Sequence, residues 1–125
     1  KRARARVYDL VANSLMTDEE PDRGRRIITA QFEDEEKEFL RGVSKVLADA
    51  TGVAACLVNR TGDQLQWSIV MGPAAGIDYA DIAPEILPLI DAKGGGKPPM
   101  WQGIGRKPDS AGAFLSAFKR LAEAR

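Results

Sequence analysis

The sequence contains no histidine and only one cysteine, Cys56. A lone cysteine forms no internal disulfide, and the zinc sites that combine Cys and His ligands are excluded. Without an imidazole, the chain also lacks histidine acid–base catalysis and the usual catalytic triads. We therefore expect no catalytic residues, no metal site and no cofactor in this chain.

Long apolar segments are missing as well. No apolar run approaches the roughly 20 residues that cross a bilayer, and the basic opening KRARARVYDL lacks the apolar segment of a signal peptide. These absences predict a cytoplasmic protein that makes no contact with membranes. The first residue is Lys1 rather than Met, from which we expect the chain to be a piece of a longer protein.

The composition is typical of a folded domain. With 125 residues, 44% of them hydrophobic and 29% charged, the chain is long enough to bury a core as one domain. The formal net charge is zero, which argues against nucleic-acid binding through overall charge. However, the segment from Lys93 to the C-terminus carries seven basic residues and two acids, so the C-terminal third is electropositive.

The first part of the sequence predicts two helices and a strand. Residues 1–16 carry apolar side chains at helical spacing, and the polar segment TDEEPDRGRR (17–26) follows as a loop. The run RIITAQFE (26–33) alternates as a strand does. Asp34 is the expected N-cap of the next helix, whose first turn holds three glutamates and whose apolar stripe extends to Ala50.

The middle of the sequence predicts a hairpin followed by a helix. The unbroken apolar run VAACLVN (53–59) is typical of a strand buried on both faces. Residues 65–71 alternate in polarity and are expected to pair with it as the second strand. Residues 78–91 are apolar enough for a helix, but Pro84 and Pro88 each remove a backbone donor, so this helix must start late or bend.

The C-terminal part predicts a long loop and a closing helix. The segment AKGGGKPPMWQGIGRKP (92–108) is expected to be a glycine- and proline-rich loop with a short edge strand at 100–104. The last helix opens near Asp109 and Ser110 and has apolar residues at helical spacing.

This order of elements predicts an α/β (α+β) two-layer sandwich. A small mixed sheet would carry the helices on one face. Residues 1–24 are expected to form a linker helix and loop, and residues 25–125 the glycine-rich domain.

The feature best suited to binding is Gly94–Gly96, followed by Lys97. Consecutive glycines can adopt positive φ angles and turn successive N–H groups toward one point, and without a Cβ they allow a phosphate to approach closely. Lys97 would add a positive charge, and Arg106 and Lys107 would extend it. The pattern predicts an anion-binding loop, with a purely structural loop as the alternative.

Neighbouring motifs limit that prediction. The segment is no nucleotide-triphosphate loop, because the spacing GxxxxGK[ST] is not met and no Ser or Thr follows Lys97. Trp101 has two interpretations, stacking on an exposed base or packing in the core. Trp67 and Cys56 lie in apolar strands, so we expect both in the core.

The string GGGKPPMWQGIG, a short basic linker and a closing amphipathic helix together resemble the DHH-associated domain in its alanyl-tRNA synthetase form, the C-Ala domain. Members typically read GGxGGGxPDxAQxGG before a helix. The matching positions are Gly94, Gly95, Gly96, Pro98, Met100, Gln102, Gly103 and Gly105, with Lys97 in a slot often held by Arg or Lys. This sequence departs from the pattern at Asp91-Ala92, Pro99 and Trp101.

The resemblance implies a non-catalytic module that binds tRNA near its elbow and supports assembly, within an alanyl-tRNA synthetase-like or alanyl-tRNA editing protein. Its partners would be tRNA, in particular alanine tRNA, the catalytic domains of a parent ligase or deacylase, and a second copy in a homodimer. The residues expected to contact RNA are Lys93, Gly94, Gly95, Gly96, Lys97, Trp101, Gln102, Gly103, Arg106 and Lys107.

Two other functions stay open at this point. The chain could be the substrate-binding lobe of a DHH-type phosphoesterase, although that class usually carries a histidine after the glycines, where this chain has Lys97. It could also serve only as a dimerisation or interdomain module that uses its first and last helices.

Overall fold

The computed structural model describes residues 2–125, and of the side chains it describes those from Arg4 onward. Lys1, the first residue of the predicted helix, lies outside the described residues. A five-stranded mixed sheet in the order β1-β2-β3-β5-β4 forms the centre. The strands are β1 (Arg26–Glu33), β2 (Val53–Thr61), β3 (Gln64–Met71), β4 (Ala92–Lys97) and β5 (Met100–Gly105).

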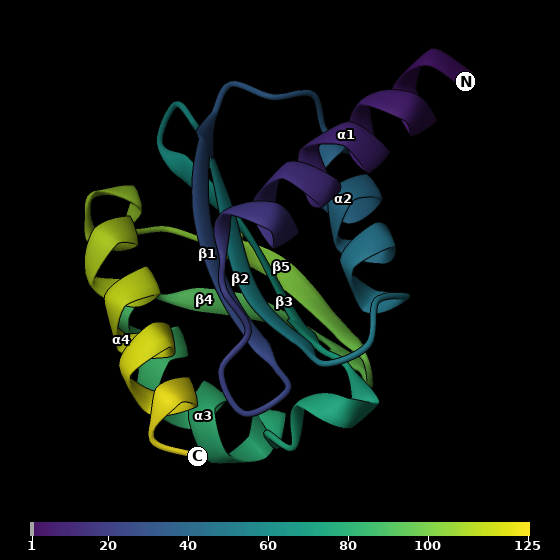
Figure 1. Ribbon diagram of the computed structural model, residues 1–125. Helices are drawn as coiled ribbons and strands as arrows, with labels where there is room; N and C mark the ends of the chain where they lie inside the picture. Colours follow the sequence, from purple (N-terminus) through teal and green to yellow (C-terminus); the bar gives the residue numbers. More distant parts are fainter. Residues whose placement is uncertain (1) are drawn as a thin grey trace.

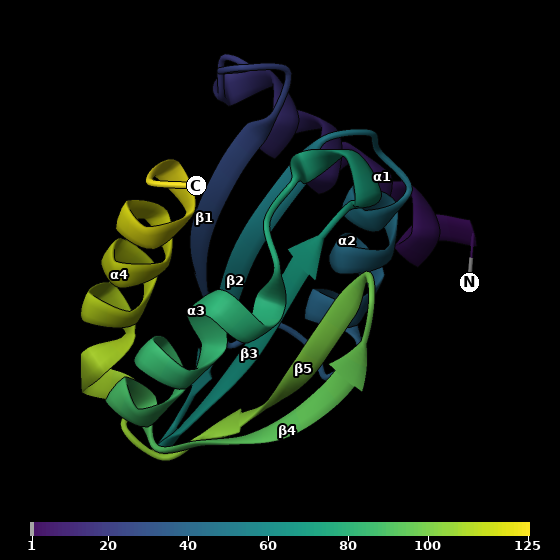
Figure 2. The ribbon, with the colours of Figure 1, turned by 90° about the horizontal axis from the view of Figure 1, so that it is seen from below.

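The helices lie on both faces of this sheet (Figures 1 and 2). On one face, α1 (Arg2–Asp18) packs on α2 (Phe39–Ala48), and α2 packs on β2 and β3. On the other face, α3 (Tyr79–Ile86) and α4 (Ala111–Glu123) cover the sheet. No helix within residues 2–125 is long and apolar enough to cross a membrane.

The α/β class and the mixed sheet are as predicted, but the expectation of helices on one face is wrong. The reason lies in β2, whose residues from Val53 to Val58 are all at most 1% exposed. Successive side chains of a strand point to opposite faces. Leu57 therefore packs with the α2 side chains, whereas Cys56 packs with Phe114 of α4.

The start of α2 also differs from the prediction. Asp34 is no N-cap, because it has a positive φ of 55° and its N–H donates to the carbonyl of Arg60 at 2.9 Å. The side chain of Asn59 then holds Glu35, accepting from its N–H and donating to its carbonyl, both at 3.1 Å. These contacts keep the chain out of a helix until Phe39, so the glutamates precede α2 instead of forming its first turn.

In the segment after β3 the helix does not start late, and Pro84 lies inside it; the helical conformation changes only next to Pro88. α3 begins after Asp78, whose carboxylate accepts from the N–H of Ala80 at 3.1 Å as an N-cap. It ends at Ile86, and the chain continues as a short 3₁₀ helix, η2 (Leu87–Ile90), with a proline in its first turn.

The glycine-rich segment is a strand, and the predicted loop is wrong there. β4 contains all three consecutive glycines and pairs antiparallel with β5, with Gly94 opposite Gly103 and Gly95 opposite Gln102. Gly96 lies opposite Trp101, and a turn with a cis peptide bond between Pro98 and Pro99 joins the two strands. β4, not residues 100–104, is therefore the edge of the sheet (Figure 2).

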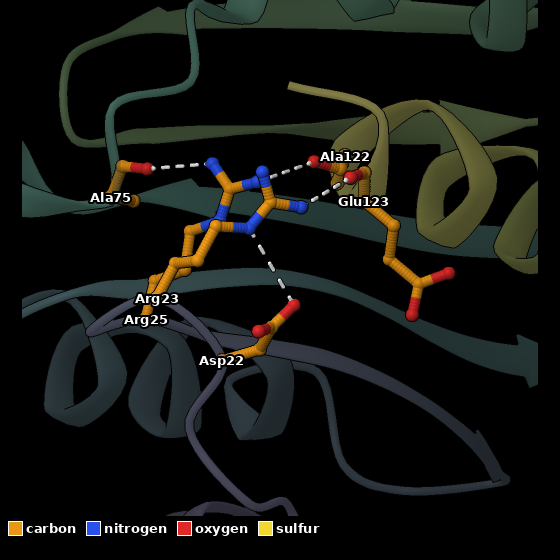
Figure 3. A network of polar contacts seen from close by, with 6 residues as sticks. All are labelled: Asp22, Arg23, Arg25, Ala75, Ala122 and Glu123. Carbon is orange, nitrogen blue, oxygen red and sulfur yellow. Dashed lines mark hydrogen bonds and ion pairs between the residues drawn. The ribbon is translucent and has the colours of Figure 1, made fainter.

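A buried arginine ties the start of β1 to the other end of the chain (Figure 3). Arg25 donates from Nη1 to the carbonyl of Ala75 at 3.1 Å and from Nη2 to that of Ala122 at 3.2 Å. Arg23 donates to the carbonyl of Glu123 at 3.2 Å. Carbonyls in the last turn of a helix lack partners within the helix, so these arginines satisfy the C-terminal end of α4.

Candidate nucleic-acid interface

The strand register sorts the side chains around β4 into two faces. Directly opposed residues of an antiparallel pair lie on the same face of the sheet. Lys93 is opposite Ile104, and Lys97 is opposite Met100, which packs in the cluster formed with α2. Both lysines and Gln102 therefore share the α2 side of the sheet, and both lysines are exposed.

The register also fixes where the main-chain amides of β4 point. Met71 N–H donates to the carbonyl of Pro99 at 2.9 Å, so the backbone polar groups of Pro99 and of every second residue after it face β3. The backbone N–H and C=O groups of Gln102 face β4, where Gly95 is the opposite residue. The N–H groups of Gly94 and Gly96 consequently point outward, to the open edge of the sheet.

A groove runs between this part of the sheet and α2. It has a volume of about 210 Å³ and is lined by Lys37, Arg41, Gln66, Gln102 and Ile104, among others. The side chain of Gln66 donates to the carbonyl of Lys37 at 3.0 Å and accepts from Asn59 at 3.2 Å, which holds the segment before α2 over the groove.

Sequence reasoning did not identify Lys37, Arg41 and Gln66. In the sequence, Gln66 is only one of the polar positions of a strand that alternates in polarity. No local signal relates any of the three to the glycines, because only the tertiary register brings α2 and β3 beside β5. Knowledge of the sheet order would have been needed to find them.

Four cations now define what we call the basic face: Lys37, Arg41, Lys93 and Lys97. Within residues 2–125, none of them has a carboxylate oxygen within 4.0 Å; the salt bridges there involve other arginines. Glu38 also lines the groove and is the one acid among its lining residues. The basic face therefore keeps a net positive charge next to the outward amides of β4.

Trp101 lies on the opposite side of the sheet from Gln102. It is 8% exposed and packs with the α3 and α4 side chains. Its indole stacks on the ring of Tyr79, with the ring centroids 4.1 Å apart and the planes at 3°. The fold thus separates Trp101 from the basic face.

The other chemistry-bearing residues of the sequence are structural. Cys56 is fully buried, and its burial raises the pKa of the thiol well above the usual value. Within the described part of the chain, no group of three or more His, Cys, Asp or Glu residues could hold a metal ion. Trp67 is 1% exposed in the core, as predicted.

Known proteins resemble this chain in sequence and in structure. It is 25% identical over 122 residues to the alanine–tRNA ligase of Thermoanaerobacter pseudethanolicus and 29% identical over 102 residues to that of Leptospira biflexa. These matches cover 93% and 78% of this chain but only 14% and 11% of the relatives. No protein-family profile matches the chain.

Among solved structures, the C-Ala domain from Aquifex aeolicus alanyl-tRNA synthetase superposes with a TM-score of 0.66. The match covers 84% of this chain and 95% of that domain, at 24% identity. The chain has the C-Ala fold. The resemblance predicted from the glycine-rich string is therefore confirmed.

In this version of the C-Ala fold, the glycines divide into two kinds. A Cβ added to Gly94 or Gly103 would overlap the backbone of the opposite strand, and Gly94 also has a φ of 144°. A Cβ on Gly105 would lie 2.8 Å from the carbonyl oxygen of Ile90. Gly95 differs, since a Cβ there would meet nothing within 4 Å. The fold requires the first three, whereas nothing inside the chain requires Gly95.

The departure at Asp91 explains why Arg106 differs from the other cations. Asp91 has a φ of 49° at the start of β4, and its Oδ2 accepts from Nε of Arg106 at 2.9 Å. The N–H groups of Arg106 and Lys107 both donate to the carbonyl of Ile90, which holds these residues at the far end of β5. In the described part of this C-Ala fold, Arg106 is paired within the chain, whereas the cations of the basic face are not.

Proposed function

We propose that this chain is a non-catalytic tRNA-binding and assembly module of an alanyl-tRNA synthetase-like or alanyl-tRNA editing protein. The alanine–tRNA ligases that it resembles in sequence and the synthetase domain that it resembles in fold both support this assignment. Alanine tRNA is the proposed ligand. The activity of the parent protein, ligation or hydrolysis of alanyl-tRNA, belongs to domains outside this chain.

One observation carries the proposal: the uncompensated cations of the basic face lie beside a glycine edge whose N–H groups point outward. Both features favour binding of a polyanion, because lysine and arginine neutralise phosphates while free N–H groups donate to phosphate oxygens. Gly95 supports the same conclusion. Its missing side chain serves no contact inside the fold, and it leaves the edge open to close approach.

The experiment that tests this function is equilibrium binding of an alanine tRNA transcript at several salt concentrations. Each neutralised phosphate contributes about −0.7 to −0.9 to the slope of log affinity against log salt, so four contacts predict a slope of roughly −3. The variant Lys93→Glu/Lys97→Glu should bind more weakly and with a shallower slope. A flat salt dependence of the wild type would refute the proposal.

A matched control comes from α4, on the other face of the sheet. Lys119→Glu changes the same kind of charge at an exposed position remote from the basic face. It should lower affinity far less than either substitution in β4. Equal losses at Lys119 and Lys97 would show that only overall charge matters.

The assembly part of the proposal rests on α1. Leu10 is 62% exposed and Val7 is 47% exposed on this helix, whereas Ala12 is buried against the domain. Two exposed apolar side chains one turn apart suit contact with a second copy or with another domain of the parent. Light scattering with and without tRNA tests this, and a monomer under both conditions would restrict assembly to contacts within the parent chain.

A further inference from the structure

A hollow lies on the opposite side of the sheet from the basic face. It has a volume of about 350 Å³ and is open on the α3 side of the sheet, between the segment that follows β3 and the turn joining β4 to β5. Its lining is mainly apolar and includes Met71, Ile77, Pro98, Trp101 and Tyr79. Asp78 is the one acid in that lining, and its carboxylate is engaged as the N-cap of α3.

The stacked pair forms one wall of this hollow. Trp101 is nearly covered, and the half-buried ring of Tyr79 lies parallel against it. Tyr79 therefore covers the indole and is itself the flat apolar ring of the pair that is partly exposed to solvent. Within residues 2–125 its hydroxyl has no hydrogen-bond partner, and partial burial raises the pKa of this phenol, so the hydroxyl stays a neutral donor.

The hollow is continuous with the edge of β4. Pro98 lines it and directly follows Lys97, and the outward N–H of Gly96 lies one residue further back. The free amide of Gly96 thus lies at the edge between the two faces, with the aromatic surface on the α3 side and the Lys97 side chain on the α2 side. Single-stranded nucleic acids are held by this combination, in which cations follow the phosphates while bases stack on aromatic rings.

We propose that the hollow binds an unpaired nucleobase of an RNA strand, stacked on Tyr79, while the adjoining phosphate lies at Gly96 and Lys97. This proposal rests on the proposed function, since it names a base-binding subsite beside the phosphate-binding edge. Trp101 acts as a positioning residue, because it touches Tyr79 and fixes its plane. Stacking does not discriminate strongly among bases, so the site contributes affinity more than sequence preference.

The test uses the wild-type chain and a single-stranded RNA of about ten nucleotides, together with the same strand in abasic form. Stacking on an aromatic side chain is worth about 1 to 3 kcal/mol per base, so the abasic strand should bind roughly 5- to 150-fold more weakly. Tyr79→Leu should weaken binding of the normal strand by a similar factor and leave the salt slope unchanged. Tyr79→Phe keeps the ring and should retain most of the affinity.

The outcomes separate this site from the proposed function. Steep salt dependence with equal affinity for normal and abasic strands would overturn the stacking site while the phosphate-binding function stands. Equal losses in Tyr79→Leu and Tyr79→Phe would also overturn it. If the wild type binds neither this RNA nor tRNA, both proposals fail. The abasic comparison needs no variant, so a folding defect in Tyr79→Leu would not prevent a decision.

Discussion

Gly94 lies opposite Gly103 in the β4–β5 pair, and neither position has room for a side chain. A Cβ on either residue would overlap backbone atoms of the other strand, and the φ of Gly94 further disfavours an L side chain. Because neither residue has a side chain, the backbones of β4 and β5 can approach closely, and the glycine-rich segment can form the edge strand β4. Gly95 differs from its neighbour Gly94, because a Cβ on Gly95 would point into open space.

Substitutions at these glycines should therefore separate folding from binding. Gly103→Ala forces two backbones apart and should lower the free energy of unfolding by about 2 kcal/mol or more. Gly95→Ala should change it by less than about 1 kcal/mol, yet weaken tRNA binding because it places a methyl group on the open edge. Chemical unfolding and tRNA binding check both effects. Similar stability losses in the two variants would contradict the assignment.

The buried guanidinium of Arg25 predicts a large stability effect. Arg25→Met keeps the length of the side chain but removes the hydrogen bonds to the carbonyls of Ala75 and Ala122. The Ala122 carbonyl keeps the N–H of Arg125 as a donor, whereas the Ala75 carbonyl loses the guanidinium. The loss should be about 2 to 4 kcal/mol. Arg23→Met, at an exposed position, is the matched control and should cost less than about 1 kcal/mol. Thermal unfolding measures both, and equal losses would show that the burial of Arg25 is unimportant.

Removal of the Asp91–Arg106 ion pair should strengthen tRNA binding. Asp91→Gly removes a side chain from a positive-φ residue and also removes an exposed ion pair, so stability should change by less than about 1 kcal/mol. Arg106 loses its partner and becomes able to bind phosphate, so tRNA affinity should rise and the salt slope steepen. The double variant Asp91→Gly/Arg106→Ala should lose that gain. A single variant with unchanged affinity would exclude Arg106 from any RNA contact.

The thiol of Cys56 should react with a labelling reagent only when the chain unfolds. Burial raises the pKa of this thiol, so the folded chain should resist a thiol reagent at pH 8 and react only as denaturant unfolds it. Because the folded state holds the thiol proton more tightly, stability is unaffected below the ordinary pKa of 9.0 and falls as the pH rises above it. Rapid labelling of the folded chain would contradict this burial.

Much of the fold could be predicted from local patterns. The apolar run of β2 indicated a strand buried on both faces, and that property required helices on both faces, a consequence that the predicted two-layer arrangement missed. Of the two prolines expected to disturb the third helix, Pro88 stands where α3 gives way to a 3₁₀ helix, because a missing N–H acts locally, whereas α3 accommodates Pro84. β4 was missed because glycine is rare in strands, and only the opposite glycine of β5 makes the pairing possible.

The candidate site was predictable only in part. The run of glycines followed by Lys97 indicates a binding site in the sequence alone. That Lys93 and Lys97 share a face follows once β4 is known to be a strand. Lys37 and Arg41 reach the groove through the packing of α2 on β3, and Tyr79 meets Trp101 through the position of α3. Such contacts join residues far apart in sequence, so no local pattern indicates them.

If the open edge of β4 receives the RNA, amide chemical shifts of the isotope-labelled chain will report it during titration with an alanine tRNA transcript. The N–H signals of Gly94, Gly96 and Lys97 should shift in a saturable way, whereas those around Lys119 on α4 should stay in place. Binding that shifts the α4 signals and leaves the three β4 signals unmoved would exclude the edge of β4 as the RNA-binding site.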